Sequence, residues 1–222
     1  MDINMKIENP NWREIRKLYD KMNDPFETMA LQSVSNTLKQ TAEDTELNLS
    51  EQMGPSGVAR KFWSVPMELL YEEKGYIVGN IFVLAQVSIT QSTIIFQKLR
   101  EYCNNKSSFP KKKQAILDFK SNIISNENIS EISLIDSVAN YFKHQDEWPS
   151  TWVSLDEDKY PTMKRVKEIG MTPQLLTDNM EIALHTLGVS DDISLITNIV
   201  QLWRENLASE LLKDSAIASS VH

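Results

Sequence analysis

The chain has 222 residues, a single cysteine and a formal net charge of −8. A charge of this sign disfavours non-specific binding to nucleic acid, because the phosphate backbone repels it. One cysteine, Cys103, excludes an internal disulfide and a zinc site built from several cysteines. Six glycines and eight prolines argue against an all-β fold with many turns.

Two helices are predicted in the N-terminal part of the chain. Apolar residues at helical spacing mark the first between Trp12 and Met22. Pro25 suits the first position of a second helix, which we expect to reach about Ala42. The periodicity then fades, and the Gly54-Pro55-Ser56-Gly57 run predicts a loop. We therefore expect an N-terminal helical hairpin and loop over residues 1–60.

The longest periodic segment runs from Tyr76 to Cys103, after a short helix that is expected to end or kink at Gly75. Its apolar stripe is wider than a coiled-coil seam, which predicts a central helix at about 76–103 that is buried on most sides. Polar residues interrupt it, so we do not expect it to span a membrane. The N-terminus has no signal-peptide pattern, so a cytoplasmic protein is expected.

The rest of the chain adds further helices. They are predicted at Lys111–Ile124, from about Ile129 to His144, and at Met163–Ile169, followed by a C-terminal helical pair that ends near Leu211. No segment shows the sustained alternation of a strand. The prediction is an all-α helical bundle in which residues 61–222 form one continuous main domain.

The segment from Ser133 to Trp152 holds the candidate site. On a helix, Asn140 and His144 lie four residues apart on the face opposite the apolar one, so they are neighbours on the surface. The last turn of a helix favours a cation, and a histidine there suits acid–base chemistry or anion binding. The alternative is that His144 bonds the final carbonyl groups of its own helix.

The run Ala139-Asn140-Tyr141-Phe142-Lys143-His144 resembles the core motif of HEPN domains. These are helical bundles whose signature is Arg, usually Asn, then about three residues, then His. The resemblance implies that Asn140 and His144 are the catalytic residues. It also implies a homodimer in which two motif helices face a shared cleft, and metal-independent cleavage of RNA in active members.

The chain departs from the family at the arginine, where it has Ala139. Charge that develops on a phosphate in the transition state is normally met by Arg or Lys, and alanine supplies neither. The resemblance therefore implies an RNA- or nucleotide-binding protein of toxin or phage-defence type without catalytic activity. Two alternatives stay open: a non-enzymatic helical module that holds a protein partner, and an active metal-independent endoribonuclease.

Lys143, Trp148 and Trp152 are the candidate binding residues beside this pair, because a cation can contact phosphate and an indole can stack on a base. Two basic clusters, at 111–113 and 164–167, are read as solvated faces or phosphate contacts. Glu181 and His185 share a helix face, but the Glu-x-x-His spacing of helical metal sites is missing. Neither a metal nor a cofactor is expected.

Overall fold

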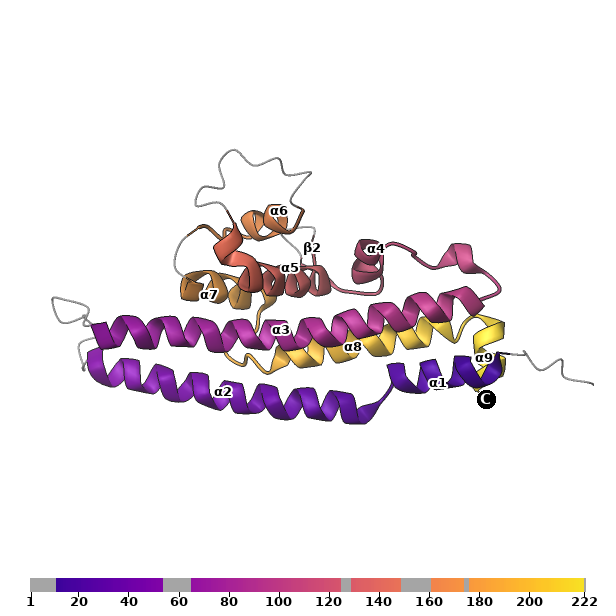
Figure 1. Cartoon of the computed structure of the whole chain (residues 1–222), viewed down its shortest axis with the longest axis horizontal. Coiled ribbons are helices and arrows are strands. Elements are labelled where there is room, and N and C mark those ends of the chain that lie inside the picture. Colours follow the sequence, from indigo (N-terminus) through magenta and orange to yellow (C-terminus); the bar gives the residue numbers. More distant parts are fainter. Residues whose placement is uncertain (1–10, 54–64, 125–128, 149–160, 174–175, 222) are drawn as a thin grey trace, which may run out of the picture.

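The computed structural model describes residues 11–53, 65–124, 129–148, 161–173 and 176–221. Over these residues the fold is a helical bundle built around one long helix, α3 (Val65–Tyr102). This helix runs most of the length of the molecule, and the other helices pack along it in two groups (Figure 1). The prediction of an all-α bundle with a long central helix is confirmed.

The first group lies below α3 in Figure 1 and comes from the two ends of the described chain. It contains α1 (Trp12–Met22), α2 (Pro25–Met53), α8 (Leu195–Leu211) and α9 (Ser215–Val221). Helices α1 and α2 follow one another along α3, so that α2 packs antiparallel to α3 rather than folding back on α1. Fully buried Ile15 and almost fully buried Met22 place the apolar face of α1 in the common core.

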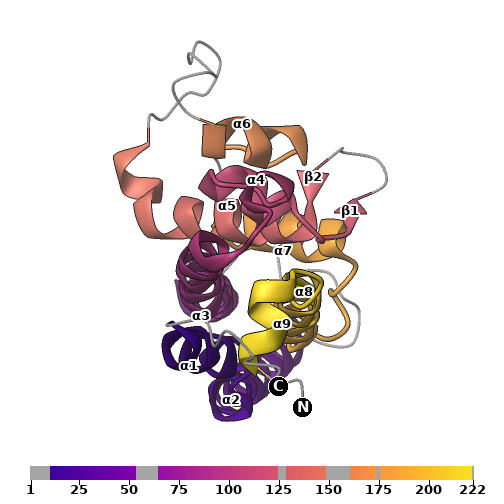
Figure 2. The ribbon, with the colours of Figure 1, turned by 90° about the vertical axis from the view of Figure 1, so that its right-hand side faces the viewer.

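The second group covers the opposite side of α3, as the end-on view shows (Figure 2). It contains α4 (Lys113–Asp118), α5 (Glu131–His144), α6 (Pro161–Glu168) and α7 (Leu176–Leu187). The 3-10 turns η1 (Lys106–Ser108) and η2 (Gln145–Glu147) follow α3 and α5. Strands β1 (Ile123–Ile124) and β2 (Ile129–Ser130) form a short antiparallel pair before α5.

Three helix boundaries differ from the predicted ones. Helix α2 continues to Met53, and α3 begins at Val65 and passes through Gly75 without a break. The glycine serves packing instead: a Cβ there would meet Thr177 Oγ1 at 2.6 Å. The helix predicted to run to Ile124 ends at Asp118, where Lys120 takes a left-handed conformation with φ of 58° and the chain turns into β1.

Helix α3 is the one helix among the described residues that is long and apolar enough to cross a membrane. Of its apolar window, 61% is buried inside the bundle. A core helix of a soluble protein passes the same test of length and composition, and the fold is compatible with such a protein.

The contact between α3 and α5 depends on Gly79. A Cβ at this position would overlap the ring of Phe142, which is half-buried against the core and lies edge-on to Tyr76 with 6.0 Å between ring centroids. We expect Gly79→Ala to lower the free energy of unfolding by about 1–2 kcal/mol, because overpacking outweighs the gain of about 1 kcal/mol in helix propensity. Urea denaturation measures the difference.

A double variant provides the control. Phe142→Ala removes the ring that the added methyl group meets, so Gly79→Ala on that background should be neutral or stabilising. If Gly79→Ala is equally harmful with and without the ring, overlap with Phe142 is not its cause.

Candidate functional site

The candidate site lies at the C-terminal end of α5, whose start and inner face are fixed by local bonds and burial. Ser130 caps the helix, and its Oγ accepts a hydrogen bond of 3.1 Å from the Ser133 amide. Ile135, Val138 and Ala139 are fully buried against the rest of the bundle. Of the candidate residues on this helix, Lys143 and His144 are exposed and Asn140 is half-buried.

Asn140 is half-buried and belongs to a polar cluster between α5, α3 and α4. Its Nδ2 donates a bond of 3.4 Å to Oδ2 of Asp136, one turn earlier in the helix. Asp136 is buried and also accepts from Gln86 at 2.9 Å and from Lys113 at 2.9 and 3.0 Å. This cluster satisfies a buried carboxylate and orients the amide of Asn140.

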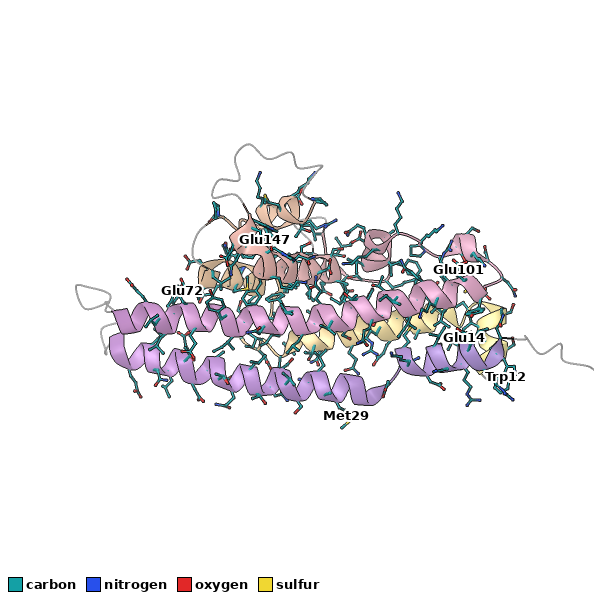
Figure 3. The ribbon with its side chains drawn as sticks, in the orientation of Figure 1. Trp12, Glu14, Met29, Glu72, Glu101 and Glu147 are labelled. Atoms are coloured by element: carbon teal, nitrogen blue, oxygen red, sulfur yellow. The ribbon has the colours of Figure 1, made fainter. Side chains whose placement is uncertain are left out.

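His144 is much more exposed, with 49% of its side chain accessible. Its Nδ1 lies 3.2 Å from Oε1 of Glu147, which projects from the turn after α5 (Figure 3). The hydrogen bonds of the predicted pair thus run in opposite directions along the chain: Asn140 turns back to Asp136, and His144 turns forward to Glu147. Lys143 is exposed beside them.

Trp148 is held in place by a chain of contacts that reaches α7. Its ring lies edge-on to Tyr141, with centroids 5.2 Å apart and an angle of 66° between the planes. The Tyr141 hydroxyl accepts a bond of 2.7 Å from Asn179, which is fully buried and also donates to the Thr172 carbonyl at 2.7 Å. Burial raises the pKa of Tyr141, which keeps the phenol neutral. Trp152 lies outside the described residues.

Residue 139, where a HEPN motif would have its arginine, points away from the candidate site. Ala139 has 0% exposure and lies in the hydrophobic core, whereas His144 is at the surface. A side chain at residue 139 points into the core, so an arginine there could not place its guanidinium on the outer side of α5. The orientation of α5 leaves no room for an arginine side chain at residue 139.

Two of the other candidate residues are paired with groups of opposite charge, and two more line cavities. Glu181 binds Lys74 at 2.9 Å, and His185 is an exposed residue at a cavity of about 480 Å³ between α2, α3 and α7. In the basic clusters, Lys113 binds the buried carboxylate of Asp136, and Lys164 shares a hollow of about 630 Å³ with carboxylates. Among the residues described, no group of three or more metal-ligating side chains occurs.

Comparison of the chain with family models, with curated proteins and with solved structures gives no match.

Proposed function

We propose that the protein is a HEPN-like RNA- or nucleotide-binding protein, of toxin or phage-defence type, that holds its ligand at the end of α5 without cleaving it. The proposal depends on one juxtaposition. His144 and Lys143 present an exposed imidazole and an exposed ammonium group at the end of α5, and within five residues the chain reaches Trp148, whose indole packs against Tyr141. A cytoplasmic homodimer is part of the proposal.

The surroundings favour contact with bases over contact with many phosphates. Aromatic rings stack on unpaired bases, and amide and imidazole groups bond to base edges. Asp146 and Glu147 follow the helix, and Glu72 projects from α3 nearby (Figure 3), so the local charge is not strongly positive. A ligand in this place would be a single-stranded segment with about one phosphate contact, made by Lys143.

Ala139 supports binding without cleavage. An endoribonuclease needs a cation that stabilises charge on the phosphate in the transition state. The buried methyl group of Ala139 cannot supply one, and the amide of Asn140 is engaged by Asp136. These residues therefore favour binding of RNA over its cleavage.

The test measures the binding of labelled single-stranded RNA by fluorescence anisotropy, with gels that detect cleavage. Trp148→Ala should weaken binding roughly fivefold to a hundredfold, the range for loss of one stacking platform. Lys143→Ala should reduce the salt dependence of log K by about 0.7, the value for one phosphate on a single strand. Lys17→Ala, an exposed lysine on α1 at the opposite end of the molecule, is the control and should change nothing (Figure 1).

His144→Ala tests the proposal most directly. We expect weaker RNA binding, relief of any growth arrest that overexpression causes, and intact RNA with both the wild type and the variant. If wild type and His144→Ala behave alike and neither binds RNA, the proposal is wrong. RNA that is cut by the wild type and left whole by the variant would instead establish the endoribonuclease.

The second candidate function is a helical module that holds a protein partner and carries out no reaction. A specific observation favours it: α3 presents an exposed face that carries no charge over half of the helix, from residue 76 to residue 94. That face borders α5, where Tyr76 lies edge-on to Phe142.

A further inference from the structure

Helix α3 is buried on most sides, but one narrow face is open to solvent. Tyr76 and Val87 are each 52% exposed and Ile94 is 47% exposed. Asn80 and Thr90 are exposed between them, and Val83 is half-buried. We call these six residues the α3 stripe. It contains no charged side chain, although 24% of the residues in the chain are charged.

The stripe lies between α5 and the N-terminal helices. On one side of it, Gly79 and Gln86 contact Phe142 and Asp136 of α5. On the other side lies α2, which packs along α3. In the end-on view α3 lies at the edge of the bundle between these neighbours, with no described helix beyond it (Figure 2). The stripe is therefore a face of α3 that the described fold leaves uncovered.

The spacing of the stripe is that of a helix–helix seam. Its members alternate at steps of four and three residues: 76, 80, 83, 87, 90 and 94. This 3.5-residue repeat keeps side chains on one line where a second helix can pack against them. From Tyr76 to Ile94 the stripe is about 27 Å long at 1.5 Å per residue. Three of its four apolar members are more than 45% exposed, which is unusual for side chains of this size on a helix that also forms the core.

The stripe is complementary to itself when the helix direction is reversed. A two-fold axis level with Ala85 would bring Tyr76 opposite Ile94 of a second copy and Val83 opposite Val87. The same axis would bring Asn80 opposite Thr90, so that polar side chains meet each other and apolar side chains meet apolar ones. A two-fold contact uses the same patch on both subunits, and this pattern satisfies that condition.

Charge also favours a second copy as the occupant. Two molecules with a net charge of −8 repel each other, and contact is easiest where the surface carries no charge. At the ends of the stripe, Glu73 and Lys98 are both exposed. In an antiparallel arrangement Glu73 of one copy lies close to Lys98 of the other, whereas a parallel arrangement would bring like charges together.

We propose that the protein self-associates through the α3 stripe, in an antiparallel contact whose two-fold axis is level with Ala85. The contact does not require RNA binding at α5. With only four apolar side chains from each copy, it is smaller than a standard interface of about 800 Å² per partner, so we expect a dissociation constant of about 1–100 µM.

The first test is sedimentation velocity of the full chain over a micromolar concentration series. Wild type should shift from monomer to dimer, and Val87→Lys should stay monomeric because it places two lysines next to the two-fold axis. Leu202→Lys is the matched control. Leu202 is an aliphatic residue on α8 that is 51% exposed, so this variant also puts a lysine in place of a half-exposed aliphatic side chain, but on a different face. Circular dichroism should show both variants folded, as expected for exposed positions.

The second test determines the direction of the helices. Asn80→Cys and Thr90→Cys are prepared separately and mixed under mild oxidation. An antiparallel contact predicts a disulfide between the two different variants, in preference to either variant with itself. The native Cys103 should not interfere, because it is buried and burial raises its pKa to about 12.

Three results would overturn the proposal. One is a wild type that stays monomeric over the whole series, and another is a dimer that Val87→Lys leaves unchanged. The third is preferential disulfide formation within each cysteine variant, which would show a parallel or unrelated contact. If the monomeric wild type binds phosphatidylcholine vesicles and Val87→Lys does not, the stripe belongs to a lipid surface instead.

Discussion

Ala139→Arg, which would give residues 139–144 the arginine of the HEPN motif that they resemble, is expected to unfold the protein rather than to create a ribonuclease. Ala139 is fully enclosed among apolar side chains of the core. A guanidinium group there would be a buried charge without a partner of opposite charge, and the arginine side chain would exceed the available volume. We expect a loss of more than about 4 kcal/mol in the free energy of unfolding, seen as a collapsed urea transition or as insoluble protein.

Lys143→Arg is the control for this experiment. It places the same guanidinium group on the exposed side of the same helix, where a change of stability within about 0.5 kcal/mol is expected. If Ala139→Arg folds with wild-type stability and cleaves RNA, then α5 can rotate to present residue 139, and our account of the site fails.

Arg204→Met is expected to lower the stability of the protein strongly. Arg204 is only 4% exposed, and its Nη2 donates to the carbonyl oxygens of Met22 at 2.9 Å and Lys21 at 3.5 Å. These carbonyls end α1, where the helix dipole favours a positive charge. Its Nη1 lies 3.5 Å from Ser88 Oγ on α3, so the side chain joins three helices.

Methionine preserves much of the apolar length of Arg204 but none of its donors. Hydrogen bonds from a charged group contribute about 1.5–3 kcal/mol each when they are well formed, so we expect a loss of roughly 2–4 kcal/mol. Urea denaturation measures the loss, and amide exchange should report faster opening of α1. Arg16→Met is the control, because Arg16 is exposed and its 3.9 Å pair with Asp20 should contribute under 1 kcal/mol. Equal losses for both variants would contradict a specific role for Arg204.

The fold class could be predicted from the sequence because apolar periodicity reflects burial directly. Ile81, Leu99 and Ile95, which carry the pattern of the central helix, are all in the core. The boundaries were harder to predict. Gly75 looks like a helix end in the sequence, but its role is to let Thr177 approach from α7, a contact 102 positions away that no local pattern reveals.

The candidate site was predicted only in part. The helix position of Asn140 and His144 follows from spacing, but their exposure differs: His144 is at the surface, and Asn140 is half-buried beside the buried Asp136. Both side chains bind local partners, Asp136 four residues before Asn140 and Glu147 three residues after His144, whereas the setting of Tyr141 beside Trp148 depends on a long-range contact. Asp136 could have been suspected, since it lies one turn before Asn140 on the same face, but nothing in the sequence connects Asn179 with Tyr141.

The pairing of α1 with α8 and α9 has a consequence for synthesis. Helix α1 is translated well before α8 and α9, which pack against it and supply Arg204. Until α8 and α9 have been translated, the apolar side of α1 lacks these packing partners, so chaperones or other nascent chains can bind it. The bundle can therefore close around α1 only after α8 and α9 have been translated.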